Sequence, residues 1–241
     1  MGAPVGASDS VATIEIGDHA GVVLCVGGAG VGNTTALQSL ALSVCTLYPP
    51  SRVQLAIADT QNGIATARTI ARRPHVIAHY AGYRRSSDPP ATWDNWCAQV
   101  EAALDRRADQ SQPEPLVLVD VVDELLGWHP EVAGTLQRIV GEGRQRRVRL
   151  IMSSNEETPQ FSLIGDRMGH RFEAPSDVVI ALRTGTAQTS MDALGRPDAW
   201  HLPESPGYAY VKSAAGAIDG PIRLFDAADV APALSSRLVT K

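Results

Sequence analysis

The stretch "GVVLCVGGAGVGNTTAL", residues 21–37, joins an apolar run to a glycine-rich turn and then to the start of a helical pattern. The apolar run, residues 21–26, does not alternate with polar residues, which is typical of a parallel strand buried on both faces. Gly27 and Gly32 have the spacing of the phosphate-binding pattern G-x-x-x-x-G-K-[ST], and Thr34 stands at its hydroxyl position. The stretch therefore predicts a strand, a phosphate-binding loop and a helix, in that order.

Backbone amides are expected to do most of the binding in this loop. Glycines let successive N–H groups turn toward phosphate oxygens, and the start of a helix adds partial positive charge. The expected cofactors are ATP and Mg²⁺, with the Thr34 hydroxyl on the metal. A glycine turn that binds no ligand is the alternative interpretation. The predicted nucleotide contacts are Gly28, Ala29, Gly30, Val31, Gly32, Asn33, Thr34 and Thr35.

Asn33 stands where the loop pattern requires lysine. A lysine ammonium would contact the β- and γ-phosphates, whereas an amide adds no positive charge. Charge-assisted hydrogen bonds contribute about 1.5–3 kcal/mol, against about 1 kcal/mol for neutral ones. Because negative charge is redistributed over the transferring phosphoryl group in the transition state, losing a fixed cation weakens hydrolysis more than binding.

A second acidic position belongs to the same chemistry. In "PLVLVDVVDELLG", residues 115–127, Asp120 ends an apolar run and could hold Mg²⁺, while Val121 stands where a water-orienting glutamate is expected. A shifted register would use Asp123 and Glu124 instead. We favour Asp120 because the apolar run before it has the length of a strand and "VDELLG" resembles a turn into a helix. With both lysine and glutamate missing, the sequence predicts weak or absent ATP hydrolysis.

Strand and helix patterns alternate through most of the chain, which has 241 residues and 44% hydrophobic content. This alternation predicts an α/β fold with a largely parallel central sheet and helices on both faces, formed by residues 1–241 as a single domain. Beyond Pro159, short pieces predict closing strands and one short helix. Other strands are predicted at 11–16, 52–60, 74–80 and 148–154, and helices at 91–110 and 130–145.

The amino-acid composition limits the classes of partner and the cellular compartment that we expect. The net charge of −5 gives no general attraction to nucleic acid or to an anionic membrane. Cys25, Cys45 and Cys97 are odd in number and widely spaced, so we expect buried thiols in a reducing compartment. Neither a membrane span nor a targeting segment is expected, which favours the cytoplasm.

The order of these motifs resembles the FtsK/SpoIIIE family of RecA-like motor ATPases, in particular the EccC-type ATPase modules of type VII secretion. The resemblance implies a RecA-like P-loop NTPase fold. The chain departs from the family pattern at Asn33, Val121, Gln61 and Asn155, where the family has lysine, glutamate, lysine and glutamine. The matching pieces are residues 21–37, "VQLAIADTQNG" (53–63), "PHV" (74–76), "LVLVDVVDELLG" (116–127), "GEGRQRRVRLIMSSN" (141–155) and "MDALGRPDAWHLPESPGYAYVK" (191–212).

The resemblance also implies partners and a place in the cell. A degenerate module of this kind would lie at the cytoplasmic face of a membrane secretion complex, beside other ATPase modules of the same assembly. It would help to recognise export substrates through their C-terminal signal peptide. Four arginines could act on a neighbouring module's nucleotide, although a solvated basic helix end is the favoured interpretation. They are Arg144, Arg146, Arg147 and Arg149.

Two alternatives remain open. One is a peptide-binding module that no longer binds nucleotide, which would use some of the four tryptophans, such as Trp200, to grip a helical export signal. The other is a DNA translocase motor, which the acidic composition and the missing lysine and glutamate disfavour.

Overall fold

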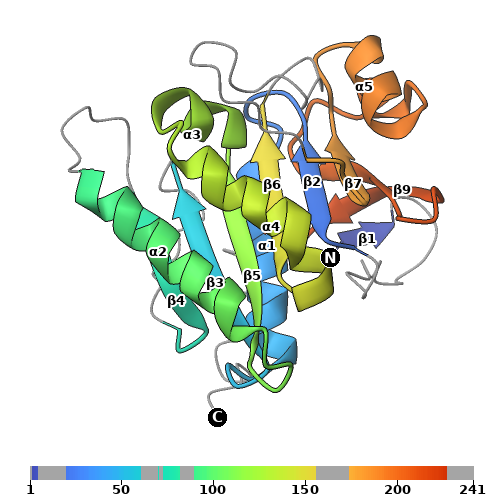
Figure 1. Ribbon diagram of the computed structural model, residues 1–241. Helices are drawn as coiled ribbons and strands as arrows, with labels where there is room; N and C mark the ends of the chain where they lie inside the picture. The colour runs from blue at the N-terminus through green and yellow to red at the C-terminus, as the bar shows by residue number, and fades with distance from the viewer. Residues whose placement is uncertain are drawn as a thin grey trace.

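The computed structural model describes residues 2–4, 20–60, 70, 73–81, 90–155 and 174–226. Within these residues, nine strands form one sheet in the order β1-β9-β8-β7-β2-β6-β5-β3-β4 (Figure 1). The strands are β1 (Gly2–Pro4), β2 (Val22–Val26), β3 (Val53–Asp59), β4 (Val76–Ala81), β5 (Glu114–Asp120), β6 (Arg149–Ser154), β7 (Val178–Leu182), β8 (Tyr208–Lys212) and β9 (Ile218–Leu224). The helices are α1 (Asn33–Leu47), α2 (Pro90–Arg106), α3 (Val122–Trp128), α4 (Val132–Arg146), α5 (Ala187–Leu194) and the 3-10 helix η3 (Asp198–His201).

The sheet is largely parallel. From β7 through β2, β6, β5 and β3 to β4, each strand runs parallel to its neighbour. The remaining three strands extend the sheet beyond β7 by antiparallel pairing. Strand β7, one of the short closing pieces beyond Pro159, pairs in parallel with β2. The antiparallel part consists of the closing strands β8 and β9 and of β1 at residues 2–4, which the sequence did not predict.

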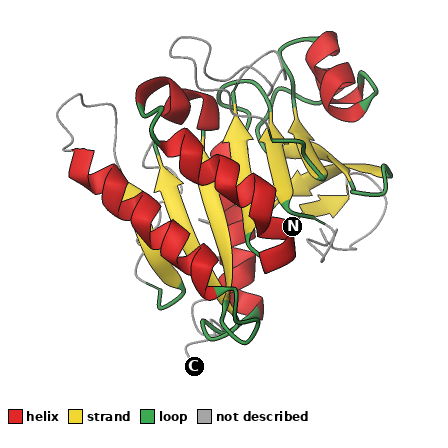
Figure 2. Ribbon diagram, in the orientation of Figure 1, coloured by secondary structure: helices red, strands yellow, loops and turns green. Residues whose placement is uncertain are grey.

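Helices cover both faces of the sheet, with α1 behind it and α2 and α4 in front (Figures 1 and 2). Strand β2 shows why its sequence is apolar without alternation. Val23 and Cys25 pack in one core cluster with Leu37 of α1, while Val22 and Leu24 pack in a second cluster that includes residues of α2 and α4. The predicted α/β class is therefore confirmed, because successive residues of a central strand are buried on opposite faces.

Helix α2, predicted at 91–110, buries one apolar face against the sheet. Trp93, Trp96, Val100 and Leu104 are all buried. The indole Nε1 of Trp96 also donates a hydrogen bond of 3.1 Å to the carbonyl of Ile57 in β3. These two tryptophans are therefore core residues.

Other expectations have mixed outcomes. All three cysteines are free thiols, with Cys25 and Cys45 buried and Cys97 half-buried. Burial raises the pKa of the Cys25 thiol to about 12. Among the described helices, none is long and apolar enough to span a bilayer. The strand predicted at 11–16 and Gln61 lie outside the described residues.

Candidate functional site

The glycine loop leaves β2 at the carboxyl edge of the sheet and opens α1. The amide of Gly28 donates to the carbonyl of Arg183 at 2.9 Å, which ties the loop to the segment after β7. A Cβ on Gly27 would lie 2.7 Å from Val31 Cγ2 and 2.9 Å from Leu182 Cβ, so only glycine fits there. Gly32 has a φ of 112°, a conformation that favours glycine, and precedes the first residue of α1.

Several amides of this loop remain available to a ligand. No side chain caps the amino end of α1. Within the described residues, the amides of Ala29, Gly30, Val31 and Gly32 donate no backbone hydrogen bond. An uncapped helix end with unpaired amides attracts anions, and phosphate groups suit it best.

Thr34 and Asp120 come together although they are 86 residues apart. Thr34 Oγ1 donates a hydrogen bond of 3.0 Å to Asp120 Oδ2, and Ser153 Oγ donates one of 2.7 Å to Asp120 Oδ1. Asp120 is fully buried at the end of β5, and burial raises the pKa of its carboxyl to about 6. Hydroxyl and carboxylate oxygens are the ligands that Mg²⁺ prefers, so this pair fits the metal.

The alternative register has a different environment. Asp123 lies in the first turn of α3, where burial raises the pKa of its carboxyl. Glu124 is exposed on the same turn. The hydroxyl of Thr34 is bonded to Asp120 and not to either of these residues. The metal roles of Thr34 and Asp120 themselves stay predictions.

Val121 occupies the position where the family resemblance calls for a glutamate. It is 1% exposed and has a φ of 50°, which is rare and strained for a β-branched residue. Its amide donates to Ser153 Oγ at 2.8 Å, so Ser153 holds both Asp120 and the backbone that follows. An apolar, buried side chain offers no group that could orient a water molecule.

The side chain of Asn33 turns into the loop. It is 5% exposed, and its Nδ2 donates to the carbonyl of Gly27 at 2.9 Å and lies 3.3 Å from the carbonyl of Ser154. The same Nδ2 donates to Asn155 Oδ1 at 2.7 Å. The amide therefore links the loop to the end of β6, and its hydrogens are already engaged with protein acceptors.

Sequence reasoning missed these links. Asn33 and Asn155 were each identified as departures from the family pattern, but nothing in the sequence joined them. Ser153 was not singled out at all. A serine at the end of a buried strand, beside the strand that ends in Asp120, is the signal that could have identified it, once strand order was known.

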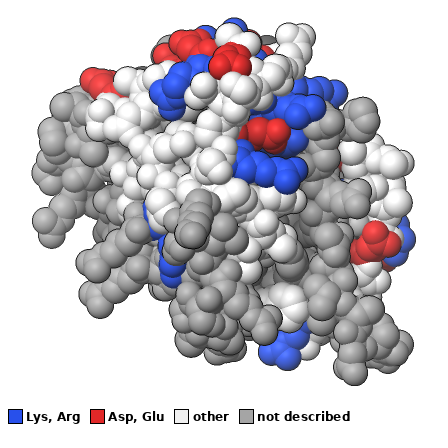
Figure 3. All heavy atoms as spheres, turned by 90° about the horizontal axis from the view of Figure 1, so that it is seen from below, with Lys and Arg blue, Asp and Glu red and all other residues white. Residues whose placement is uncertain are grey.

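The four arginines near the end of α4 lie at the opposite edge of the sheet from the glycine loop. Each forms an ion pair, so in Figure 3, seen from below Figure 1, basic and acidic side chains of the described residues lie side by side. Their action on a neighbouring module stays a prediction. The pairs are Arg144 with Asp177, Arg146 with Glu142, and Arg147 and Arg149 with Glu114.

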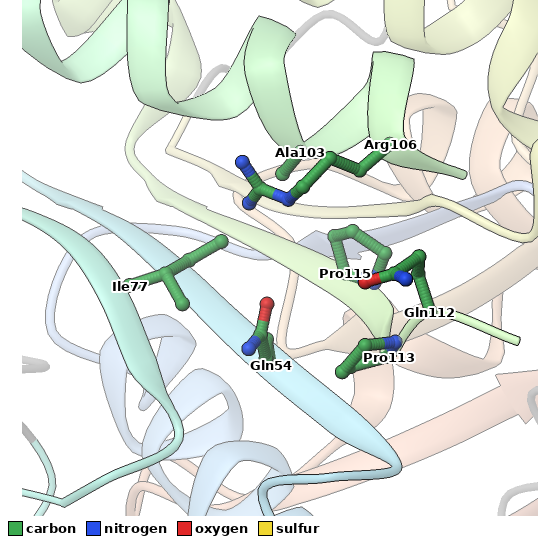
Figure 4. Close-up of a pocket in the computed structure, with 7 residues that line it drawn as sticks. All are labelled: Gln54, Ile77, Ala103, Arg106, Gln112, Pro113 and Pro115. Carbon is green, nitrogen blue, oxygen red and sulfur yellow. The ribbon is translucent and has the colours of Figure 1, made fainter. Parts of the chain in front are cut away.

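A cavity of about 200 Å³ also lies at that opposite edge (Figure 4). Gln54 and Pro115, near the amino ends of β3 and β5, line it together with Arg106. Asp59 and Asp120 end the same two strands, roughly 16 Å away at 3.3 Å per residue. This cavity is therefore separate from the glycine loop.

The site and strand order define a class of protein. The loop-bearing strand β2 and the carboxylate-bearing strand β5 are separated by β6, and the loop and the carboxylate meet at the carboxyl edge of a parallel sheet. Together with the structural matches below, this arrangement is that of a RecA-like P-loop ATPase fold, as the resemblance implied.

The sequence comparisons then specify the relatives. Residues 2–111 match the model of the FtsK/SpoIIIE family, which confirms the resemblance. The chain is 26% identical over 229 residues to the ESX-4 secretion system protein EccC4 of Mycobacterium tuberculosis, covering 83% of this chain and 18% of that protein. It is 26% identical over 217 residues to the ESX secretion system protein EccC of Thermomonospora curvata, covering 79% and 16%. The chain is thus homologous to EccC ATPases of type VII secretion and spans less than a fifth of these two relatives.

Solved structures agree on the fold. The cytoplasmic domain of the type VII secretion ATPase EccC of Thermomonospora curvata superposes with a TM-score of 0.64 at 24% identity, covering 86% of this chain and 25% of that chain. EccC ATPases 2 and 3 of the same organism, in complex with a signal sequence peptide, give 0.65 at 19% identity, covering 90% and 41%. At these identities the matches establish the fold alone.

Proposed function

We propose that this chain is a degenerate ATP-binding module of a type VII secretion ATPase of the FtsK/SpoIIIE type. It binds ATP with Mg²⁺, hydrolyses it slowly or not at all, and serves assembly and the recognition of export substrates. Nucleotide is bound through residues 28–35, with Thr34 and Asp120 on the metal. We also propose that residues 1–241 form one such module.

The observation that carries the proposal is the hydrogen bond between Thr34 and Asp120 beneath a loop whose amides from Ala29 to Gly32 have no backbone partner among the described residues. A metal-binding pair and an anion-binding loop are what ground-state binding of a nucleotide needs. Mg²⁺, when bound, would neutralise charge on the phosphates. Thr34 and Asp120 would hold it, and the amides from Ala29 to Gly32 would bind phosphate oxygens.

The geometry of the same site supports ATP hydrolysis less well than it supports ATP binding. The Asn33 amide is engaged with the Gly27 carbonyl and Asn155, and it carries no charge to offer the transition state. Val121 cannot orient a water molecule, because its side chain is apolar and buried. A module that retains nucleotide without turning it over is therefore the function that the geometry supports best.

The proposed partners follow from the relatives. A Thermomonospora curvata EccC fragment with ATPases 2 and 3 was solved with a signal sequence peptide. By analogy, we expect this chain to contact the C-terminal signal peptide of an export substrate and other ATPase modules of the same assembly. Its expected location is the cytoplasmic face of a membrane secretion complex.

Calorimetric titration of the 241-residue protein with ATP, with and without Mg²⁺, tests nucleotide binding. We expect saturable, Mg²⁺-dependent binding that Thr34→Ala weakens about tenfold, because a hydrogen bond to a charged group contributes roughly 1.5–3 kcal/mol. Thr46→Ala is the matched control, since its hydroxyl bonds the Leu42 carbonyl at 2.7 Å near the other end of α1. Equal ATP affinity in Thr34→Ala and wild type would contradict the metal role of Thr34.

Two outcomes would favour other functions. Absence of ATP binding at millimolar concentration would favour a peptide-binding module without nucleotide, to which Trp128 and Trp200, 41% and 36% exposed, could offer aromatic surface. Strong, salt-sensitive binding to duplex DNA would favour a translocase motor. The net charge of −5 argues against that outcome.

A further inference from the structure

The two sides of the glycine loop differ chemically. On one side, toward β6 and β5, lie Asn155 and Asp120, where the metal and the terminal phosphates are proposed to bind. On the other side lies the end of β7, the second neighbour of the loop-bearing strand. A nucleotide with its terminal phosphates near Asp120 would therefore extend its nucleoside toward β7.

Two backbone hydrogen bonds hold that second side against the loop. Gly28 donates to the carbonyl of Arg183 at 2.9 Å, and Gly207 donates to the carbonyl of Val31 at 2.9 Å. A Cβ on Gly32 would lie 3.2 Å from the Gly207 nitrogen, so the two segments approach closely. A ligand bound by side chains of this region would therefore be held at a fixed position relative to the phosphate loop.

Arg183 and Trp200 form a cation–π pair in this region. The Arg183 guanidinium carbon lies 5.8 Å from the centroid of the Trp200 ring, and Arg183 Nη1 lies 3.2 Å from Glu204 Oε1. Trp200 is 36% exposed, in contrast to the core tryptophans Trp93 and Trp96 at 1% and 2%. Arg183 Nε is buried without a hydrogen-bond partner within the described part of the chain.

The charge of this pair decides which ligand group it suits. Glu204 neutralises Arg183, so the cluster has no excess positive charge to attract a phosphate. Aromatic rings and guanidinium planes are surfaces on which nucleobases stack. An ordinary exposed tryptophan needs no ligand, but this one lies beside the guanidinium of Arg183, a residue whose carbonyl accepts a hydrogen bond from the phosphate loop.

The geometry points to Arg183 and Trp200 as the subsite for the base of the bound nucleotide, a role that rests on the proposed nucleotide binding by the loop. Stacking on this pair would contribute to affinity for the nucleoside part alone. The metal and phosphates would be held elsewhere, by Thr34, Asp120 and the loop amides.

Binding of ATP and of inorganic tripolyphosphate, each with Mg²⁺, separates the two parts of the site. We expect wild type to bind ATP more tightly than tripolyphosphate. Trp200→Leu should weaken ATP binding about 5- to 100-fold and leave tripolyphosphate binding unchanged. Arg183→Met, which retains the backbone bond to Gly28, should have the same selective effect. Trp128→Leu, the matched control on α3, should change neither.

The remaining outcomes distinguish failure of the base subsite from failure of nucleotide binding by the loop. Equal affinity of wild type for ATP and tripolyphosphate, or equal loss of both ligands in Trp200→Leu and Arg183→Met, would overturn the base subsite while leaving nucleotide binding by the loop intact. Unchanged ATP affinity in both variants would also overturn it. Failure of wild type to bind either ligand would instead contradict the proposed function, and the base subsite would fall with it.

Discussion

Asn33 Nδ2 donates a hydrogen bond of 2.7 Å to Asn155 Oδ1, joining two residues that are 122 positions apart. By the family resemblance, these positions hold the loop lysine and the glutamine after β6. The two departures from the pattern are thus in contact. An amide at position 33 places no charge in the buried loop, where a charge would be costly when no ligand is bound.

The pair should be energetically coupled. We expect Asn33→Ala to lower the free energy of unfolding by about 2 kcal/mol and Asn155→Ala by about 1 kcal/mol, because each leaves polar groups without partners. In the double variant the two losses should fall short of additive by about 1 kcal/mol. Urea denaturation of the four proteins measures this. Simple additivity would mean that the bond has no net effect on stability.

Restoring the lysine alone should not restore turnover. Asn33→Lys supplies the missing cation, but Val121 still offers no group to orient water. We therefore expect hydrolysis by Asn33→Lys to stay at the wild-type level, and the double variant Asn33→Lys/Val121→Glu to exceed it by about tenfold or more. Phosphate release under saturating Mg²⁺ and ATP is the measurement, with Thr34→Ala added to the double variant as the control. Brisk turnover by Asn33→Lys alone would show that Val121 is not limiting.

Without a bound metal, the ionised carboxylate of Asp120 should lower the free energy of unfolding. Burial raises the pKa of its carboxyl to about 6, above the value of 3.8 for an unperturbed aspartate, so the folded state disfavours the ionised form. The resulting penalty is absent below the unfolded pKa, grows as pH rises from 4 to 6, and is complete above that range. At pH 7.5 it amounts to about 2–3 kcal/mol.

We therefore expect Asp120→Asn to be more stable than wild type at pH 7.5 in EDTA, with a difference that shrinks as pH falls through about 6 toward about 4. Urea denaturation at three pH values tests this. Asp94→Asn, an exposed change of the same charge on α2, is the control and should stay within about 0.5 kcal/mol of wild type. A variant less stable than wild type at pH 7.5 would contradict the expected penalty.

The sequence predicts the parallel part of the fold because its cause is local. Strands buried on both faces must be apolar throughout, and β2 and β5 can be recognised by that property alone. The glycine loop is recognisable for a similar reason, since Gly27 and Gly32 stand where a side chain would clash or strain the backbone.

The contacts within the site could not be predicted in the same way. The bonds of Asn33 to Asn155 and of Ser153 to Asp120 depend on β6 lying between β2 and β5, which is a property of strand order. Val121 is misleading even locally, because a β-branched residue ordinarily argues against a left-handed conformation. Arg183 and Trp200 meet only because η3 packs against α5 and β8, near the end of β7.

The sequence does not indicate that Arg107 is buried. In "DRRADQ" it has the same immediate context as Arg106, yet Arg106 is exposed and Arg107 is 1% exposed. Its guanidinium donates to the carbonyl of Arg146, at the end of α4, at 2.8 Å and to that of Gln110 at 2.8 Å. One side chain therefore joins the end of α4 to the turn before β5.

We expect Arg107→Met to lower the free energy of unfolding by about 3 kcal/mol, because several partly buried carbonyls lose their donor while the apolar volume is roughly kept. Arg106→Met removes the same charge from the adjacent, exposed position and should change stability by no more than about 0.5 kcal/mol. Thermal and urea denaturation of both variants measure the difference. Equal, small effects would mean that water replaces the guanidinium at these carbonyls, whereas a large loss confined to Arg107 would support its role in joining the end of α4 to the turn before β5.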